Sequence, residues 1–149
     1  MVKKETLLNE LRNMIEKKNQ SNIKTIKEIR EAKNTDTKSS AGDKYETGRE
    51  MMQAELNKYE NQLALNQKLL SELSKIDSSI VNLVIGFGSL IKTNQGIYFI
   101  SVGLGAITIQ NETIYVLSLA SPVGKLLEGK KKGDTIFFQN REIKINKVY

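Results

Sequence analysis

The chain contains no cysteine, no histidine and no tryptophan, and it has a single proline among its 149 residues. Without cysteine it forms neither disulfides nor a thiolate zinc site, and it has no thiol nucleophile. Without histidine it lacks imidazole metal ligands, the Ser-His-Asp triad and the usual general base near neutral pH. Any catalysis of its own would rest on carboxylates, lysine, tyrosine or serine, so we expect that the chain is not an enzyme.

Long hydrophobic runs are also absent. No stretch approaches the roughly 18 apolar residues that a membrane span needs, and the charged start, residues 1–5, is unlike the apolar centre of a signal peptide. We therefore expect a cytoplasmic protein with no membrane contact. The 23 Lys and Arg against 17 Asp and Glu leave a net charge of +6, which favours an acidic protein surface or a nucleic acid as partner.

Glycine and proline divide the chain into two parts. Of ten glycines only Gly42 and Gly48 precede residue 80, and Pro122 lies in the second half. Glycine, proline and aromatic residues mark turns and strands, whereas their absence marks long helices. We therefore predict a helical hairpin over residues 1–77 and a small sheet domain over residues 78–149, which together make an α+β protein.

The first half predicts two long helices. In the second helix, steps of four and three residues connect nine positions, of which seven are apolar or tyrosine: Tyr45, Arg49, Met52, Leu56, Tyr59, Leu63, Asn66, Leu70 and Leu73. This repeat is typical of a coiled-coil seam, in which Asn66 and, in the first helix, Asn22 would set the register. Two such helices with a short polar connection predict an antiparallel hairpin whose tip lies at about residues 35–46. A dimerisation device built from long helices is the alternative interpretation.

The second half predicts an antiparallel sheet with one short helix. Strand-like segments are residues 83–85, 89–92, 97–102, 107–109, 113–119, 135–138 and 143–148. Ser121 as the N-cap and Pro122 at the first helical position indicate a helix start, and Gly129 indicates its end. A basic turn follows, made of Lys130, Lys131 and Lys132. These lysines could contact nucleic acid or an acidic protein surface, or they could form a solvated turn.

The segment from Ser121 to Asp134 resembles a signature of the bacterial transcript cleavage factors, the Gre family. It has the Ser-Pro start, the short helix and the Lys-x-Gly-Asp turn before a strand, and Phe87–Ser89 and Tyr98–Gly103 follow the family's order of elements. The resemblance extends over nearly the whole chain, because a helical hairpin followed by a small sheet domain is also the family's architecture. It implies an FKBP-like C-terminal domain, although we expect no isomerase activity.

The resemblance implies a partner and a mode of action. Gre-family proteins bind RNA polymerase at the rim of its secondary channel through the C-terminal domain, and the hairpin enters the channel. By resemblance, the polymerase-binding residues are Ser121, Pro122, Gly124 and Lys125. The family's acidic tip helps to hold a catalytic Mg²⁺ of the polymerase, which then cleaves backtracked RNA. The resemblance thus implies a monomer with no stably bound cofactor and with Mg²⁺ shared with the polymerase.

The tip departs from the family pattern, which reads approximately Asp-Leu-Ser-Glu-Asn-Ala-Glu-Tyr. Aligned on Tyr45, Lys38 stands in place of the first acid, Ala41 in place of the central Glu, and Lys44 in place of the acid before the tyrosine. Both lysines oppose cation binding. We therefore expect a channel-binding regulator that modulates cleavage without strongly stimulating it.

The acids that remain at the tip are Asp36, Asp43 and Glu46. Asp43 is the candidate for a weak metal contact because it is nearest to the bend, and it would alternatively interact with the helix N-terminal dipole. The competing hypothesis for the whole chain is a protein-interaction module that does not bind polymerase and uses the coiled coil to dimerise.

Overall fold

The structure, a computed structural model, describes residues 1–36 and 43–149, with side chains for residues 1–35 and 46–149. The chain divides into two compact units. The sheet unit comprises Met1–Arg12 together with Ser71–Tyr149, and the hairpin unit comprises Asn13–Leu70. The sheet unit therefore includes the first turns of the first helix and the last turn of the second. The domain boundary between residues 77 and 78 stays a prediction.

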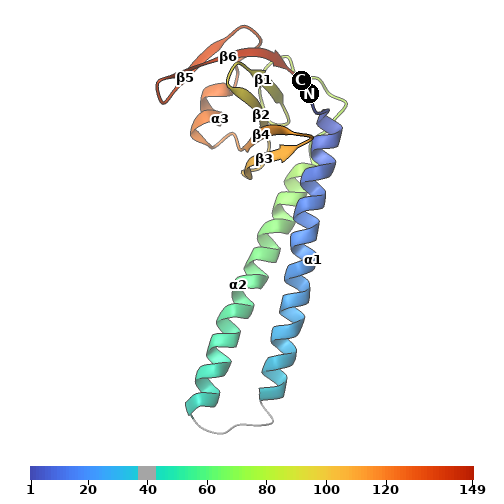
Figure 1. Cartoon of the computed structure of the whole chain (residues 1–149), viewed down its shortest axis with the longest axis vertical. Coiled ribbons are helices and arrows are strands. Elements are labelled where there is room, and N and C mark those ends of the chain that lie inside the picture. Colours follow the sequence, from blue (N-terminus) through green and yellow to red (C-terminus); the bar gives the residue numbers. More distant parts are fainter. Residues whose placement is uncertain (37–42) are drawn as a thin grey trace. The chain divides into compact units, whose positions relative to one another are not determined.

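Two long helices run through the hairpin unit, α1 (Lys4–Asp36) and α2 (Asp43–Ser74) (Figure 1). They contain 33 and 32 residues, so that each is roughly 50 Å long at 1.5 Å per residue. Lys33 Nζ donates a hydrogen bond to Gln53 Oε1, and Arg30 forms an ion pair with Glu60, which joins the two helices side by side. The predicted antiparallel pair of helices is confirmed.

The predicted seam of α2 is the face that the helix buries. Leu56, Asn66 and Leu73 are buried, and the other described seam positions from Arg49 onward are half-buried. The side chain of Tyr45 lies outside the described residues. On α1 the buried apolar positions within the hairpin unit are Ile15 and Ile26, so the heptad pattern identified the contact face correctly.

A polar layer of buried asparagines interrupts this seam. Asn19 and Asn66 are buried at 8% and 3% exposure. Gln62 Nε2 donates to Asn66 Oδ1 at 3.2 Å, while Asn66 Nδ2 and Asn19 Oδ1 have no hydrogen-bond partner among the described residues. A buried amide costs stability unless it is paired, and such a layer opposes any slip of one helix along the other. This burial fits the register role that we predict for Asn66.

The sheet unit contains six strands and one short helix. The strands are β1 (Leu90–Thr93), β2 (Gly96–Ile100), β3 (Gly105–Ile109), β4 (Glu112–Leu117), β5 (Thr135–Phe138) and β6 (Arg141–Val148), and the helix is α3 (Pro122–Leu127). The strand order is β3-β4-β2-β1-β6-β5. The α+β class is therefore confirmed.

The sheet is mixed, which corrects the expectation of a wholly antiparallel sheet. β2 and β4 are parallel, with Tyr98 opposite Tyr115, whereas the other neighbouring strands are antiparallel. The reason lies in β3, which reverses the chain at the outer edge, so that β4 returns beside β2 in the direction of β2. A second correction concerns residues 83–85, where only Val84 forms an isolated bridge, to Lys131, and no strand is present.

Each face of the sheet buries apolar side chains. On one face Phe99 lies between Leu90 of β1 and Val116 of β4, which are its register partners, and all three are at most 1% exposed. The opposite face carries the apolar cluster that Ile91, Ile100, Leu127, Ile136, Ile143 and Ile145 form with neighbouring residues. Tyr98 and Tyr115 stack on this side with ring centroids 5.3 Å apart. No helix in the described part of the chain is long and apolar enough to cross a membrane.

Candidate functional site

The acidic candidates lie where the two long helices end. Asp36 is the last residue of α1 and Asp43 is the first residue of α2, so both belong to the same end of the hairpin (Figure 1). Their side chains, and the whole of Lys38 and Ala41, lie outside the described residues. Glu46, in the first turn of α2, is exposed. Among the residues that are described, no three His, Cys, Asp or Glu form a group that could hold a metal ion.

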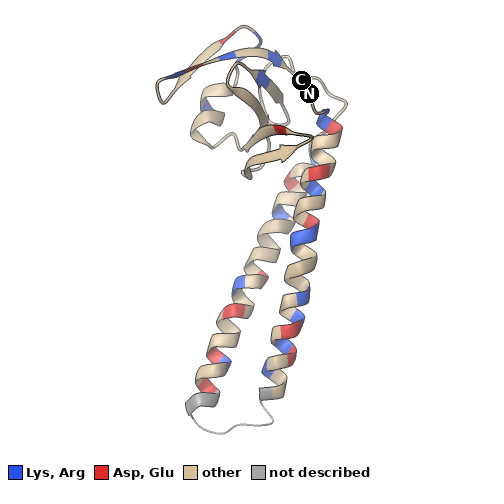
Figure 2. Ribbon diagram, viewed as in Figure 1, with Lys and Arg blue, Asp and Glu red and all other residues tan. Residues whose placement is uncertain are grey.

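The flanks of the hairpin carry charges of both signs. Basic and acidic residues are mixed along α1 and α2, as Figure 2 shows. The Arg30 Nη2 to Glu60 Oε1 ion pair is 2.6 Å long, and both side chains are more than one third exposed. An exposed pair of this kind contributes little to stability. The described parts of both helices therefore carry charges of both signs along their length.

The start of α3 is held by a hydroxyl cap. Gly124 N donates to Ser121 Oγ at 3.0 Å, and Ser121 Oγ in turn donates to the carbonyl of Ser118 at 2.7 Å. Ser121 has an extended backbone and Pro122 occupies the first turn, as the sequence predicts. These bonds fix the loop before the helix and leave Pro122 and Lys125 exposed. Of the four predicted polymerase-binding residues, Pro122 and Lys125 are thus exposed, Ser121 is half-buried and Gly124 is buried. Their role in binding stays a prediction.

Gly124 is the residue of this loop that only glycine can occupy. A Cβ at this position would lie 2.1 Å from the Ser118 carbonyl oxygen and 2.8 Å from Ser121 Oγ. Real Cβ atoms do not approach a backbone oxygen so closely, and the backbone cannot move aside as a flexible side chain can. The glycine is therefore required for the close approach of the first turn to the preceding loop.

The basic turn is anchored through its backbone. Ile85 N donates to the Lys130 carbonyl at 2.8 Å, and Lys131 N donates to Asp134 Oδ2 at 2.9 Å. The side chains of Lys130, Lys131 and Lys132 are all exposed. The turn is thus ordered from within while its ammonium groups face water, which suits an electrostatic contact with a polyanion or an acidic surface.

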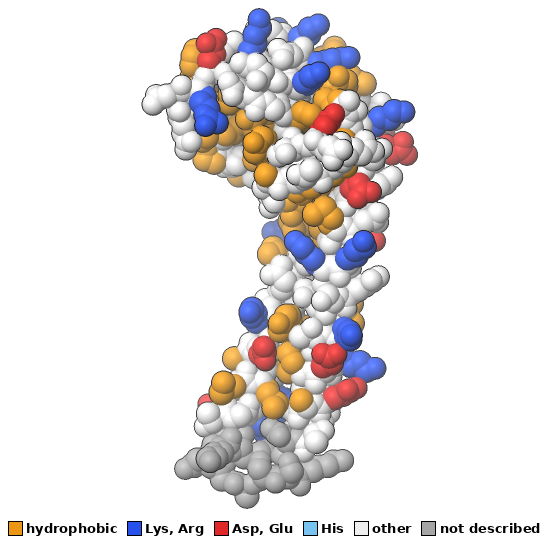
Figure 3. Space-filling model, viewed as in Figure 1, with side chains coloured by type: hydrophobic (Ala, Val, Ile, Leu, Met, Phe, Trp, Pro, Cys, Tyr) orange, Lys and Arg blue, Asp and Glu red, His pale blue; other side chains and the backbone are white. Residues whose placement is uncertain are grey.

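Exposed apolar side chains near this turn were missed at the level of sequence. Phe137 is 70% exposed, Leu83 80%, Val84 54% and Leu126 39%. Hydrophobic side chains are visible over the sheet unit in Figure 3. The apolar segment at residues 83–85, which the sequence predicts as a strand, contributes Leu83 and Val84 to these exposed side chains and forms no strand. No comparable signal in the sequence marks Phe137 or Leu126 as exposed.

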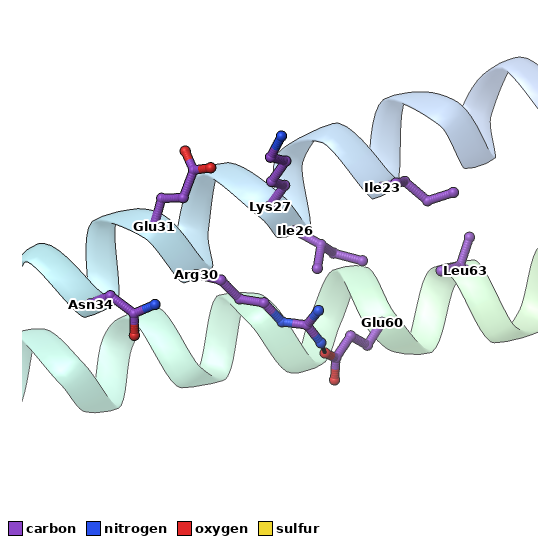
Figure 4. Close-up of a pocket in the computed structure, with 8 residues that line it drawn as sticks. All are labelled: Ile23, Ile26, Lys27, Arg30, Glu31, Asn34, Glu60 and Leu63. Atoms are coloured by element: carbon purple, nitrogen blue, oxygen red, sulfur yellow. Dashed lines mark hydrogen bonds and ion pairs between the residues drawn. The ribbon is translucent and has the colours of Figure 1, made fainter.

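A groove in the hairpin unit is lined by residues of both α1 and α2 (Figure 4). Its apolar residues are Ile23 and Ile26 of α1 and Leu63 of α2. Ile23 is 54% exposed although its neighbour Ile26 is buried. Lys27, Arg30, Glu31, Asn34 and Glu60 complete the lining. The apolar centre with a charged rim is typical of a contact surface.

A lysine is buried at the beginning of α1, inside the sheet unit. Lys4 is 7% exposed, and its Nζ donates to the carbonyl of Ile80 at 2.8 Å. Burial lowers the pKa of Lys4, and the carboxylate of Asp77 partly opposes that shift. Asp77 itself accepts from Ser79 N and Ser79 Oγ, hydrogen bonds that lower the pKa of this exposed carboxyl group.

The Lys4 environment predicts a specific pH dependence. Between the lowered pKa and the ordinary value of 10.5, the unfolded chain binds more protons at Lys4 than the folded chain does. The free energy of unfolding should therefore gain a term that rises with pH through that window and levels off above it. Lys4→Met should remove this term, which urea unfolding measured from neutral pH to about pH 10.5 would detect.

The matched control is Lys3→Met, since Lys3 is exposed. Tyr98, whose pKa is raised chiefly by burial, contributes to the pH profile of the parent chain and of both variants. The difference between the profiles of a variant and the parent therefore reports the substituted lysine alone. If the parent and Lys4→Met show the same pH profile, the ammonium group of Lys4 is not buried in solution.

Comparisons with known proteins give a distant likeness to a solved structure. No protein-family model matches the chain, and a search of curated proteins finds no significant match. Among solved structures, a chain described as the structure of the transcription factor Gfh1 matches over 93% of this chain and 92% of that chain. The two are 18% identical, with a TM-score of 0.37. At this distance no residue role passes from that protein to this chain.

Proposed function

We propose that the chain is a Gre-like regulator of bacterial-type RNA polymerase. It docks at the secondary channel through the sheet unit, inserts the end of the hairpin and modulates cleavage of backtracked RNA. The proposal rests on the local structure of the segment from Ser121 to Asp134, whose sequence resembles the Gre signature. The hydroxyl cap of Ser121, the helix α3 and the anchored turn form one ordered surface directly before β5.

Two further observations support this function. The hairpin has helices of 33 and 32 residues, and carboxylate residues stand at both helix ends of the tip, Asp36 and Asp43. A factor that acts inside the active centre of another enzyme needs no nucleophile and no general base of its own. The lack of cysteine and histidine is therefore compatible with the proposal.

Binding to RNA polymerase is the first experiment. The purified chain should co-migrate with core RNA polymerase from its own source at near-physiological salt. A variant in which a short Gly-Ser linker replaces residues 35–44 should still bind, because docking is assigned to the sheet unit. Lys125→Glu should weaken binding, since Lys125 is exposed on the docking surface. Absence of binding by the intact chain would contradict the proposal.

The role of the tip carboxylates gives a second prediction. Carboxylate oxygens are preferred Mg²⁺ ligands, so the Asp36→Ala, Asp43→Ala double variant should slow any cleavage that the chain stimulates in a backtracked complex. We expect a loss of about tenfold or more with unchanged polymerase binding. RNA cleavage rates measured at fixed Mg²⁺ test this.

Glu50→Ala is the control, because Glu50 is an exposed acid of α2 that we do not assign to the metal. Full cleavage activity in the double variant would exclude a metal role for Asp36 and Asp43. It would leave docking through the sheet unit untouched.

A dimeric interaction module is the second candidate function. The observation in its favour is the groove of Figure 4, together with Met51 and Leu65, which are 70% and 51% exposed on α2. Sedimentation equilibrium separates the two candidates. A monomer at micromolar concentration favours the polymerase regulator. A stable dimer that Ile23→Lys dissociates favours the module.

A further inference from the structure

β5 forms one end of the sheet and leaves an edge unpaired. In the order β3-β4-β2-β1-β6-β5, only β6 pairs with β5, and no other described strand lies on its second side. The strand reads Thr-Ile-Phe-Phe and has no charge and no proline. Proteins usually protect an edge of this kind with lysine, proline or a covering segment.

The backbone groups that face outward on β5 can be identified from its register. Phe138 is opposite Arg141 across a two-residue turn in which Gln139 and Asn140 both have positive φ, the geometry of a type I′ hairpin. Ile145 N donates to the carbonyl of Asp134. Because bonded and non-bonded pairs alternate in an antiparallel ladder, the even-numbered residues of β5 bond to β6. The N–H and C=O groups of Thr135 and Phe137 therefore point away from the sheet.

A groove accompanies this free edge. Helix α3 and β5 contact each other, and the groove beside them is lined by Lys125, Leu126, Glu128, Lys130 and residues 135–137. Ile136 is buried in the apolar cluster, whereas Phe137, one residue on, is 70% exposed and points to the opposite face of the strand. A strand added at this edge would meet Phe137 on one face and the α3 side, with its two lysines, on the other.

The opposite edge of the sheet is built differently. On β3 the exposed residues are Gly105, Ala106 and Thr108, all of them small. They offer little apolar surface to an added strand. A free edge, an exposed phenylalanine and flanking lysines thus occur together only at β5 among the described strands.

We propose that the β5 edge binds an extended segment of a partner protein as an added strand, with apolar and acidic side chains in alternation. The apolar side chains cover Phe137 and the acidic ones face Lys125 and Lys130, which outnumber Glu128 in the groove. Backbone hydrogen bonds to Thr135 and Phe137 supply affinity, and the alternation supplies specificity. The proposal does not depend on RNA polymerase being the partner, although Lys125 belongs to both surfaces.

The probe is a capped heptapeptide of alternating valine and glutamate, added to the full chain. We expect saturable binding in which the amide hydrogens of Thr135 and Phe137 exchange with water at least about tenfold more slowly at saturation. The amide of Thr108, on the β3 edge, should not change. Failure of Thr135 and Phe137 to gain protection at the highest soluble peptide concentration would overturn the proposal.

Backbone methylation of the peptide is the matched control. In an added strand, alternate N–H groups face β5 and the others face away. Methylating one alternate set should weaken binding by about tenfold or more, whereas methylating the other set should be tolerated. Binding that is equally sensitive, or equally insensitive, to both methylations would show that no strand is added.

Charge reversal at the two lysines tests the preference for acidic side chains. The Lys125→Glu, Lys130→Glu variant should prefer a valine-lysine peptide to the valine-glutamate peptide. The methylation test uses the unmodified chain and does not depend on the folding of this variant.

Self-association of the free chain would contradict the proposal. If the free chain is a dimer in which the amide of Phe137 is already protected, the occupant of the edge is a second copy and the proposal is wrong.

Discussion

Gly124→Ala is expected to destabilise the sheet unit by about 3 kcal/mol or more, a fall in Tm of roughly 10 °C. The new Cβ would lie 2.1 Å from the Ser118 carbonyl oxygen, so the first turn of α3 must move away from the loop before it. That movement breaks the bond from Gly124 N to Ser121 Oγ and strains the bond from Glu128 N to the Gly124 carbonyl. Thermal unfolding followed by circular dichroism measures the loss.

Gly103→Ala is the control for this prediction. A Cβ at Gly103 has no neighbour within 4 Å, so this change should alter stability by less than about 0.5 kcal/mol. Equal Tm values for the two variants would show that Ser118 and Gly124 do not approach each other in solution. Because the same loop carries the docking surface, Gly124→Ala should also abolish co-migration with RNA polymerase at temperatures where the chain remains folded.

Phe99→Ala should cost about 3–5 kcal/mol of unfolding free energy. Phe99 is 0% exposed and lies on β2 between Leu90 and Val116, so the deleted ring leaves a cavity that two flanking strands cannot fill. Urea unfolding of the purified variant measures the loss, with the midpoint shifting while the slope stays constant.

Phe137→Ala is the matched control, because the same residue type is 70% exposed on β5. It should change the unfolding free energy by no more than about 0.5 kcal/mol. A similar loss in both variants would mean that Phe137 is covered in the free chain. In that case the edge of β5 would already be occupied and the strand-addition proposal would lose its basis.

Local patterns predicted the elements whose contacts are close in sequence. The heptad positions of α2 are the ones that it buries, Ser121 and Pro122 begin α3, and β5 has the bounds that its composition predicts. Each of these depends on spacing or on capping chemistry that acts within a few residues.

Long-range pairing was beyond the same patterns. No local signal shows that β4 returns parallel to β2, because this depends on where β3 joins the sheet. Composition also does not show which of two adjacent phenylalanines is exposed. Phe137 is exposed, whereas Phe138 packs on the apolar cluster. Which face of an edge strand is buried is decided by the neighbouring helix, and so this part of the candidate site became visible only in the structure.

The sheet unit is assembled from two separate stretches of chain, residues 1–12 and 71–149. Residues 13–70 are consequently an insertion between them. The length of this insertion can therefore change without changing the contacts within the sheet unit. Adding seven residues at matched positions of α1 and α2 would extend the hairpin by about 10 Å and keep its seam in phase, because seven is the repeat. Duplication or loss of such paired heptads would change the length of the hairpin in steps of about 10 Å and leave the contacts within the sheet unit unchanged.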